Sequence, residues 1–180
     1  FRTGGEYEYF RFRQNIVQDT LLERFSDFSS YLTLFAALNA DTRDRAYFST
    51  KGFIARARVE YVIPISENWS QDLFTSSFIA YINYLQNARL GKRFTLKPGL
   101  FAGTTLRQDD TPPVHHTFAL GGLNPSNYLD KHIYFAGLRF LQSFGYHTYV
   151  ARVKLQYNIF RRFYLTGQVN AWANGLNIEK

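Results

Sequence analysis

The sequence predicts an all-β fold, an antiparallel up-and-down transmembrane β-barrel. Three observations support this class. Apolar and polar residues alternate along at least seven segments, several segments continue for about 10–13 residues, and aromatic residues recur near the ends of the apolar faces. Alternation places apolar and polar side chains on opposite faces of a strand. Strands of this length exceed the usual soluble length of about 5–6 residues and can cross a bilayer when tilted.

The individual strands follow from the same pattern, in chain order. In the clearest segment, Tyr149 and Val153 share one face and Arg152 lies on the other. In the first segment the apolar phase slips between Tyr9 and Phe10, which predicts a β-bulge there. The expected strands cover residues 5–13, 31–38, 53–63, 74–84, 93–106, 148–160 and 162–174.

The connections between these segments alternate in length. A barrel with one short-turn rim and one long-loop rim produces this order. No linker or repeat interrupts it, so residues 1–180 are expected to form a single domain. Because the chain contains no methionine, we expect it to be a mature or cut piece of a longer chain. The domain is also expected to be incomplete at both ends. The compact connections are 40–51, 86–92 and 161–162, and the longer ones are 14–28, 64–72 and about 107–146.

Alternation alone does not decide between two kinds of barrel. A soluble barrel that binds an apolar ligand has apolar residues inside, whereas a membrane barrel turns them outward to lipid. From Tyr149 to Tyr157 a strand spans roughly 26 Å, or about 20 Å when tilted, close to the height of a lipid-facing apolar band. The polar faces mix charged, amide and hydroxyl groups, as a wet lumen would. These features favour the membrane orientation. The lumen-facing residues are then Arg56, Arg58, Glu60, Arg152 and Lys154.

Composition excludes several kinds of chemistry. The chain has no cysteine, so it can form no disulfide, thiolate metal site or cysteine nucleophile. It contains neither the Gly-x-Ser-x-Gly elbow of a lipase nor a glycine-rich phosphate loop. The net charge is +7, but lysine and arginine recur singly, which speaks against nucleic-acid binding. We therefore expect no enzyme activity, cofactor or metal site in this chain.

The segment "DTRDRAYFSTKG" contains a turn with a recognisable pattern. It resembles the signature turn of the bacterial surface antigen superfamily of outer-membrane barrels, in which Phe-Pro-Thr-x-Gly precedes a long strand. Phe48, Thr50 and Gly52 match this pattern, Asp41 supplies its acidic residue, and Ser49 replaces the proline. The glycine permits a tight reversal of the chain. The threonine can bond to nearby backbone.

A second segment, "HHTFALGGLNP", is similar to the Phe-x-x-Gly-Gly motif of the same superfamily. In that family the motif opens the long sixth extracellular loop, which folds back into the barrel. The matching residues here are Phe118, Gly121, Gly122 and the following Asn124. The order of the motifs implies about half of a sixteen-stranded barrel, with roughly seven to eight strands in this chain. It also implies the outer membrane of a Gram-negative bacterium.

The resemblance departs from the family pattern after the glycine pair. Family members that insert or translocate proteins usually carry Val-Arg-Gly-Phe or a similar sequence there, whereas Leu123, Asn124 and Pro125 follow here. Gly-Gly-Leu-Asn is more similar to barrels fused behind patatin-like phospholipase domains. The resemblance therefore implies a membrane anchor or a protein insertion or translocation pore. Its implied partners are the lipid bilayer, the rest of the barrel or another copy, and client proteins or an upstream lipase domain that carries any catalysis.

The long connection at about 106–145 is too apolar for an external loop. Such loops are usually polar. We predict that residues 118–125 fold into the lumen and plug it, with the two glycines letting the backbone approach the wall. The apolar residues that need burial are Phe118, Leu120, Leu123, Tyr128, Ile133, Tyr134, Phe135, Leu138, Phe140 and Leu141.

Overall fold

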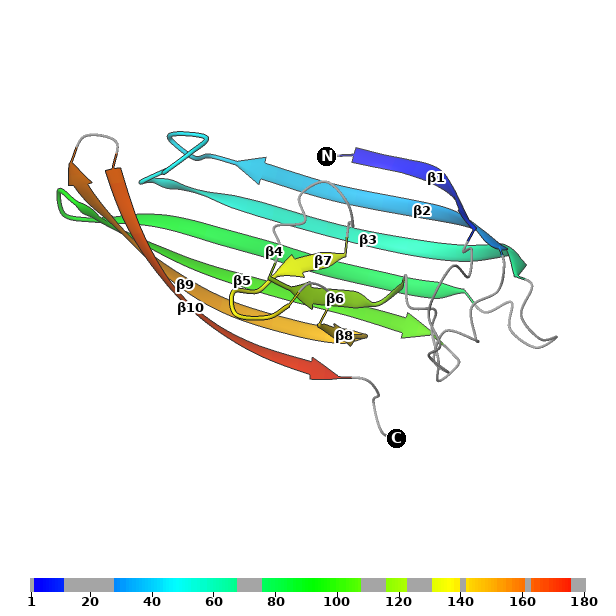
Figure 1. Cartoon of the computed structure of the whole chain (residues 1–180). Helices are drawn as coiled ribbons and strands as arrows, with labels where there is room; N and C mark the ends of the chain where they lie inside the picture. The colour runs from blue at the N-terminus through cyan, green and yellow to red at the C-terminus, as the bar shows by residue number, and fades with distance from the viewer. Residues whose placement is uncertain are drawn as a thin grey trace.

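The computed structural model describes residues 2–11, 28–67, 76–107, 116–122, 131–139, 142–160 and 163–175. Seven strands form one antiparallel sheet in the order β1-β2-β3-β4-β5-β9-β10 (Figure 1), which confirms the predicted fold class. In the part of the chain that is described, no helix is long and apolar enough to cross a membrane. The strands are β1 Arg2–Arg11, β2 Phe28–Asp41, β3 Gly52–Glu67, β4 Ser77–Leu90, β5 Phe94–Arg107, β9 His147–Phe160 and β10 Phe163–Gly175.

The alternating sequence gives this curved sheet two different faces. The convex face carries apolar side chains that are open to the surroundings, such as Leu38, Val153 and Val169 at 57%, 46% and 75% exposure. The concave face carries Thr33, Glu60 and other polar residues, together with some aromatic ones. A soluble barrel has the opposite arrangement, with its apolar residues inside. The convex face is therefore suited to lipid, and the concave face corresponds to the lumen.

The first strand corrects one expectation. β1 pairs with β2 along its whole length without a register shift, so the bulge predicted between Tyr9 and Phe10 is wrong. The concave face accepts aromatic residues elsewhere: Phe35 lies under a guanidinium group there and Phe101 packs against another phenylalanine. An aromatic residue at a concave register position therefore needs no bulge.

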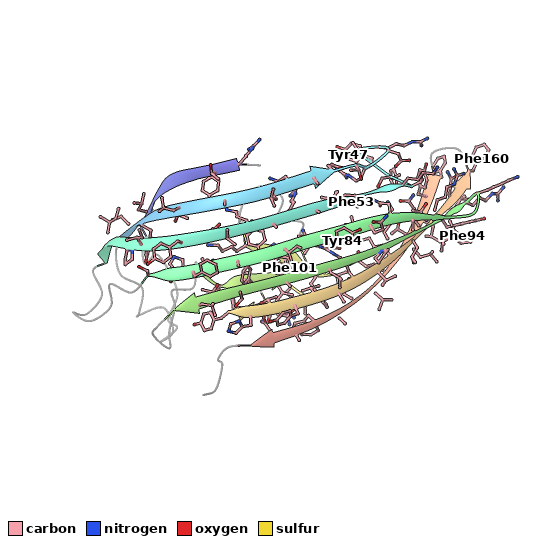
Figure 2. The ribbon with its side chains drawn as sticks, turned by 180° about the vertical axis from the view of Figure 1, so that it is seen from behind. Tyr47, Phe53, Tyr84, Phe94, Phe101 and Phe160 are labelled. Atoms are coloured by element: carbon pink, nitrogen blue, oxygen red, sulfur yellow. The ribbon has the colours of Figure 1, made fainter. Side chains whose placement is uncertain are left out.

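The lengths of the connections distinguish the two ends of the sheet. The strands β2, β4 and β9 end at the same side of the sheet, where β3, β5 and β10 begin after only a few residues (Figure 1). We call it the short-turn end. Aromatic residues gather there: Figure 2 shows Tyr47, Phe94 and Phe160 near this end of the ribbon. The ring of Phe94 packs on Tyr157 with 4.7 Å between centroids, as expected for an aromatic girdle.

Between β5 and β9 the chain forms a second sheet of three short strands, β6 Phe118–Gly121, β7 His132–Tyr134 and β8 Ser143–Gly145, in the order β7-β6-β8. We call residues 116–122, 131–139 and 142–145 the plug. The plug lies against the concave face of the large sheet (Figure 1). The main hydrophobic core of the described residues forms at this contact. Its members are Tyr31, Val62, Ile79, Phe101, Phe118, Leu120, Ile133, Phe135 and Val150.

Candidate functional site in the lumen

Phe118, the first residue of β6, anchors the plug to the wall. Its side chain is fully buried. The ring meets those of Phe101 and Tyr81 edge-on, with centroids 5.5 and 6.2 Å away. Gly103 in β5 makes room for it, because a Cβ atom at that position would lie 2.6 Å from the Phe118 ring. Edge-to-face aromatic packing adds to the stabilisation from area burial. Phe118 therefore fastens the plug to β4 and β5.

The glycine pair after β6 lets the plug fold back on itself. The Gly121 carbonyl accepts a hydrogen bond from the Phe135 amide at 2.9 Å, and the Gly122 amide donates to the Arg139 carbonyl at 3.3 Å. A Cβ atom on Gly122 would collide with the carbonyl oxygen of Leu138. The sequence suggested a close approach to the wall. The structure shows that the close approach is to another part of the plug.

Glu60 makes the ionic contact between wall and plug. This β3 side chain is nearly inaccessible, and its Oε2 lies 3.0 Å from Nζ of Lys131 in the plug. Its Oε1 lies 2.7 Å from Nε of Arg58 on the same strand. The Arg58 guanidinium also lies 4.4 Å from the centre of the Phe35 ring. A buried carboxylate needs such partners because removing it from water is costly.

β10 holds the plug through asparagine side chains and one indole. Asn170 donates a hydrogen bond of 3.3 Å to the carbonyl of Ala136, and Asn174 donates one of 2.8 Å to the backbone of β8. The Trp172 ring meets Phe135 edge-on at 4.9 Å. The plug thus contacts the wall on β3, β4, β5 and β10. It braces strands that lie far apart in the sheet order.

Nearer the short-turn end the wall is basic. Lys97 of β5 and Lys154 of β9 are directly opposite one another in the register. Arg152 donates a hydrogen bond of 2.9 Å from Nη2 to Oδ1 of Asn83 on β4. Arg56 of β3 is paired in register with the same asparagine. We call Arg56, Lys97, Arg152 and Lys154 the basic wall.

The signature turn is held by one carboxylate. Asp44 accepts hydrogen bonds from the amide and hydroxyl of Thr50, both at 2.8 Å, and from the amide of Lys51 at 3.2 Å. Desolvation would raise the pKa of Asp44, but these hydrogen bonds together outweigh it and lower the pKa to about 2. Gly52 has a φ of +88°, and a Cβ atom there would collide with the Thr42 carbonyl. The glycine is therefore required by the turn.

The same turn reaches across to the last strand. Phe48 has a φ of 50°, which is uncommon for a bulky residue. Its ring stacks on Tyr164 of β10 at 4.3 Å and 9° between planes. The buried hydroxyl of Ser49 donates a 3.0 Å hydrogen bond to Asn87 of β4. Proline, the family residue at this position, has no side-chain donor and could not make this bond.

The structure gives a location to most of the predicted site residues. Phe118, Gly121 and Gly122 lie in the plug, and Asn124 falls outside the described residues. Asp41 ends β2 and forms an ion pair with Arg43 at 2.6 Å. The remaining turn residues are those described above. Five residues that alternate with the apolar positions lie on the concave face: Arg56, Arg58, Glu60, Arg152 and Lys154.

Sequence reasoning missed several residues that form the contact between the plug and the wall. Gly103 carried a usable signal, since a glycine inside a strand often marks a close approach. No sequence signal marked Lys131, because it lies in a stretch without a clear alternation of apolar and polar residues. Trp172 and Asn174 share a face of β10, but nothing in the sequence says that the plug reaches that strand.

Comparison with known proteins identifies one matching family. A family model described as the OMP85 superfamily matches residues 1–179. No curated protein and no solved structure matches the chain. The match confirms the resemblance to surface antigen barrels, and it covers the sheet, the plug and the signature turn together. The chain therefore belongs to the OMP85 superfamily.

Proposed function

We propose that this chain is part of an outer-membrane barrel that acts as a plug-closed route for inserting or translocating proteins. The OMP85 superfamily suggests an insertion or translocation barrel in the outer membrane of Gram-negative bacteria or its organelle equivalent. Its members are generally not enzymes. One observation carries the proposal: an apolar convex face is combined with a plug that packs on the concave face.

The plug contacts suit a closure that can open. Phe118 is held by apolar packing, whereas Lys131 and Ala136 are held by an ion pair and an amide hydrogen bond. Polar contacts of this kind can be exchanged for water without a large loss of free energy. A client that competes for them could therefore release the contacts of Lys131 and Ala136 first, before the apolar packing of Phe118, Ile133 and Phe135 is lost.

A cysteine pair tests the route. The chain has no native cysteine, so Ala136→Cys with Asn170→Cys can be linked specifically by a short bifunctional reagent. We expect the linked protein to stay closed in planar bilayers and the unlinked protein to show openings. Ala136→Cys with Val169→Cys, on the convex face, is the matched control and should not link. Equal conductance of linked and unlinked protein would contradict a route through the plugged lumen.

An anchor for a fused lipase is the second candidate. The Gly-Gly-Leu-Asn sequence favours it, and so does Phe135, which fastens the plug to Trp172 of β10 at 4.9 Å. A plug tied to several strands suits a barrel that never opens. This candidate predicts a Gly-x-Ser-x-Gly elbow in the polypeptide encoded before Phe1, and determining that sequence tests it. A string of small periplasmic repeats there would favour the route instead.

The sheet also needs a neighbour on each side. Among the described strands, β1 pairs with β2 and β10 pairs with β9, and each has one edge without a described partner. Unpaired backbone groups in lipid are very costly. We therefore propose that further strands of the barrel, or another copy, complete both edges. Analytical ultracentrifugation in detergent separates a closed monomer from a pair of copies.

A further inference from the structure

We propose that the basic wall binds an extended, acidic polypeptide segment that enters the lumen from the short-turn end. The inference rests on the proposed function, because a polypeptide reaches this wall only if the barrel handles polypeptides. It adds the chemical class of the client segment and the residues that recognise it. The cations of the wall lie on β3, β5 and β9, and Asn83 of the intervening strand β4 lies between them in the register.

The wall carries positive charges that are not paired with a described carboxylate. Lys97 and Lys154 are direct cross-strand partners, and like charges in such positions are destabilising. Arg152, on the same strand as Lys154, bonds to the neutral Asn83. Among the described residues, none of the four cations of the wall forms an ion pair with a carboxylate. An anionic ligand would relieve this repulsion.

The described carboxylates nearby are already engaged. Glu60 is held by Arg58 and by Lys131. Asp41 and Asp44 act on Arg56 and Lys97 from the turn, but each is bound within the turn itself, Asp41 by a guanidinium and Asp44 by hydrogen bonds at 2.8 Å. They offset part of the wall's charge from a distance, but none of the three forms an ion pair with Arg56, Lys97, Arg152 or Lys154. A carboxylate in direct contact with the wall would therefore come from outside the described part of the chain.

Strand β6 of the plug does not cover this part of the wall. On β5, Phe118 packs at Phe101 and Gly103, whereas Lys97 lies farther toward the start of the strand. Tyr134 of β7 marks the boundary, since Nζ of Lys154 lies 5.7 Å from the centre of its ring. A segment entering from the short-turn end would thus meet the basic wall before it meets the plug.

The width of the basic wall favours an extended polypeptide over a single small anion as its ligand. Strands lie about 4.8 Å apart, so the three intervals from β3 to β9 cover roughly 14 Å. One phosphate or sulfate cannot bridge that distance, whereas carboxylates on alternate residues of an extended chain can occupy successive positions. Asn83 and Gln168 add amide groups beside the cations, and such groups can bond to the backbone of a bound chain.

Three labelled peptides test the site without any variant. They are ten-residue peptides that alternate serine with glutamate, glutamine or lysine, and binding to the detergent-solubilised protein is measured by fluorescence anisotropy at low salt. We expect the glutamate peptide to bind at least about tenfold more tightly than the glutamine peptide and to weaken as salt rises. Equal binding of the glutamate and glutamine peptides would overturn the proposal.

Matched variants locate the binding. Lys97→Gln with Lys154→Gln should weaken the glutamate peptide by about fivefold or more, because two charge-assisted contacts are lost. Arg89→Gln with Lys92→Gln removes the same charge at the exposed β4–β5 turn and should change binding by less than about twofold. Lys97→Arg with Lys154→Arg should restore it. An equal loss in the turn variant would show that only net charge matters and would refute the wall as the site.

The two proposals can fail separately. If the unlinked cysteine variant opens in bilayers but the glutamate peptide has no advantage, the acidic client is wrong and the route stands. If the peptide binds as expected but no variant ever conducts, the route is wrong and the binding site stands. Addition of the peptide to either side of an open channel then tests direction, since only the short-turn side should give blockade at low concentration.

Discussion

At the scale of single residues, Glu60 controls the ionic contact of the plug. Replacing it with glutamine removes the negative charge and leaves Arg58 and Lys131 facing one another. We expect Glu60→Gln to lower the free energy of unfolding by about 1–3 kcal/mol, since the contact is largely shielded from water. Urea unfolding in detergent, followed by fluorescence, measures this change.

A matched variant shows whether burial of the carboxylate is the reason for the loss of stability in Glu60→Gln. Asp41→Asn also removes a carboxylate from an arginine, but this side chain is 51% exposed. Exposed ion pairs contribute little because water and salt screen them. We therefore expect a much smaller change for Asp41→Asn, and faster proteolysis of the plug only for Glu60→Gln. Similar effects of both variants would show that Glu60 does not hold the plug.

Asp44 gives the signature turn a dependence on pH. The pKa of this carboxyl falls from 3.8 to about 2 in the folded chain. A lowered folded pKa means that the stabilising contribution is fully present above about pH 4 and is lost as the pH falls toward 2. Amide exchange of Thr50 and Lys51, measured by NMR, should therefore be constant from neutral pH to about 5, after correction for the intrinsic exchange rate. It should accelerate below about 4.

The control for this prediction is Asp44→Asn. An amide side chain does not titrate, so the variant should show weaker protection of Thr50 and Lys51 at neutral pH and no additional loss between about pH 4 and 2. If the wild-type turn kept its protection down to pH 2, the carboxylate would not be what holds it.

At the scale of elements, the orientation of β9 and β10 can be tested by two arginine substitutions. Val153 faces the convex side and Thr166 the concave side, and the side chains of both are exposed. An arginine on the lipid face costs about 2–4 kcal/mol near the middle of the bilayer. We expect this loss for Val153→Arg in vesicles and a far smaller one for Thr166→Arg. Equal folding yields would contradict the assignment of the convex face to lipid.

The plug as an element depends on the close approach at Gly122. A methyl group there would meet the Leu138 carbonyl, and overpacking of this kind typically costs about 1–3 kcal/mol. We expect Gly122→Ala to loosen the plug and expose it to proteases. Gly167→Ala is the matched control, because an added Cβ at that position has no neighbour within 4 Å. Unchanged protection in Gly122→Ala would mean that the plug tolerates the shift.

The strands could be predicted from the sequence, but the contacts of the plug could not. Alternation fixes the face of each residue locally, which is why Val153 and Arg152 could be assigned to opposite faces before the structure was known. The contact of Lys131 with Glu60 depends on how the long connection folds in space. No local period encodes that. Burial of Phe118 could be expected from its apolar neighbours, but its pocket beside Gly103 required the register of β5.

At the scale of the whole molecule, the plug and the signature turn cover the concave face at different positions along the strands. The plug covers the half of β5 that contains Phe101 and Gly103. The signature turn reaches β10 near the short-turn end through the Phe48–Tyr164 stack. The basic wall lies between these two contacts. A segment entering from the short-turn end would therefore pass the turn before it reaches the wall.

The height of the apolar band predicts the membrane in which the molecule is most stable. Tyr149 is near one end of the band, and the Phe94–Tyr157 pair marks the other. The strand between Tyr149 and Tyr157 covers roughly 20–26 Å, depending on tilt. We expect folding yield and resistance to urea to be highest in phosphatidylcholine vesicles with hydrocarbon cores of about 20–25 Å. They should fall toward about 30 Å, because a thick bilayer must thin around a short band. Thr166→Arg, altered on the concave face, should keep the same optimum. A stability that rose steadily with thickness, or a chain that stayed monomeric in buffer without detergent, would show that the convex face is not the surface that meets lipid.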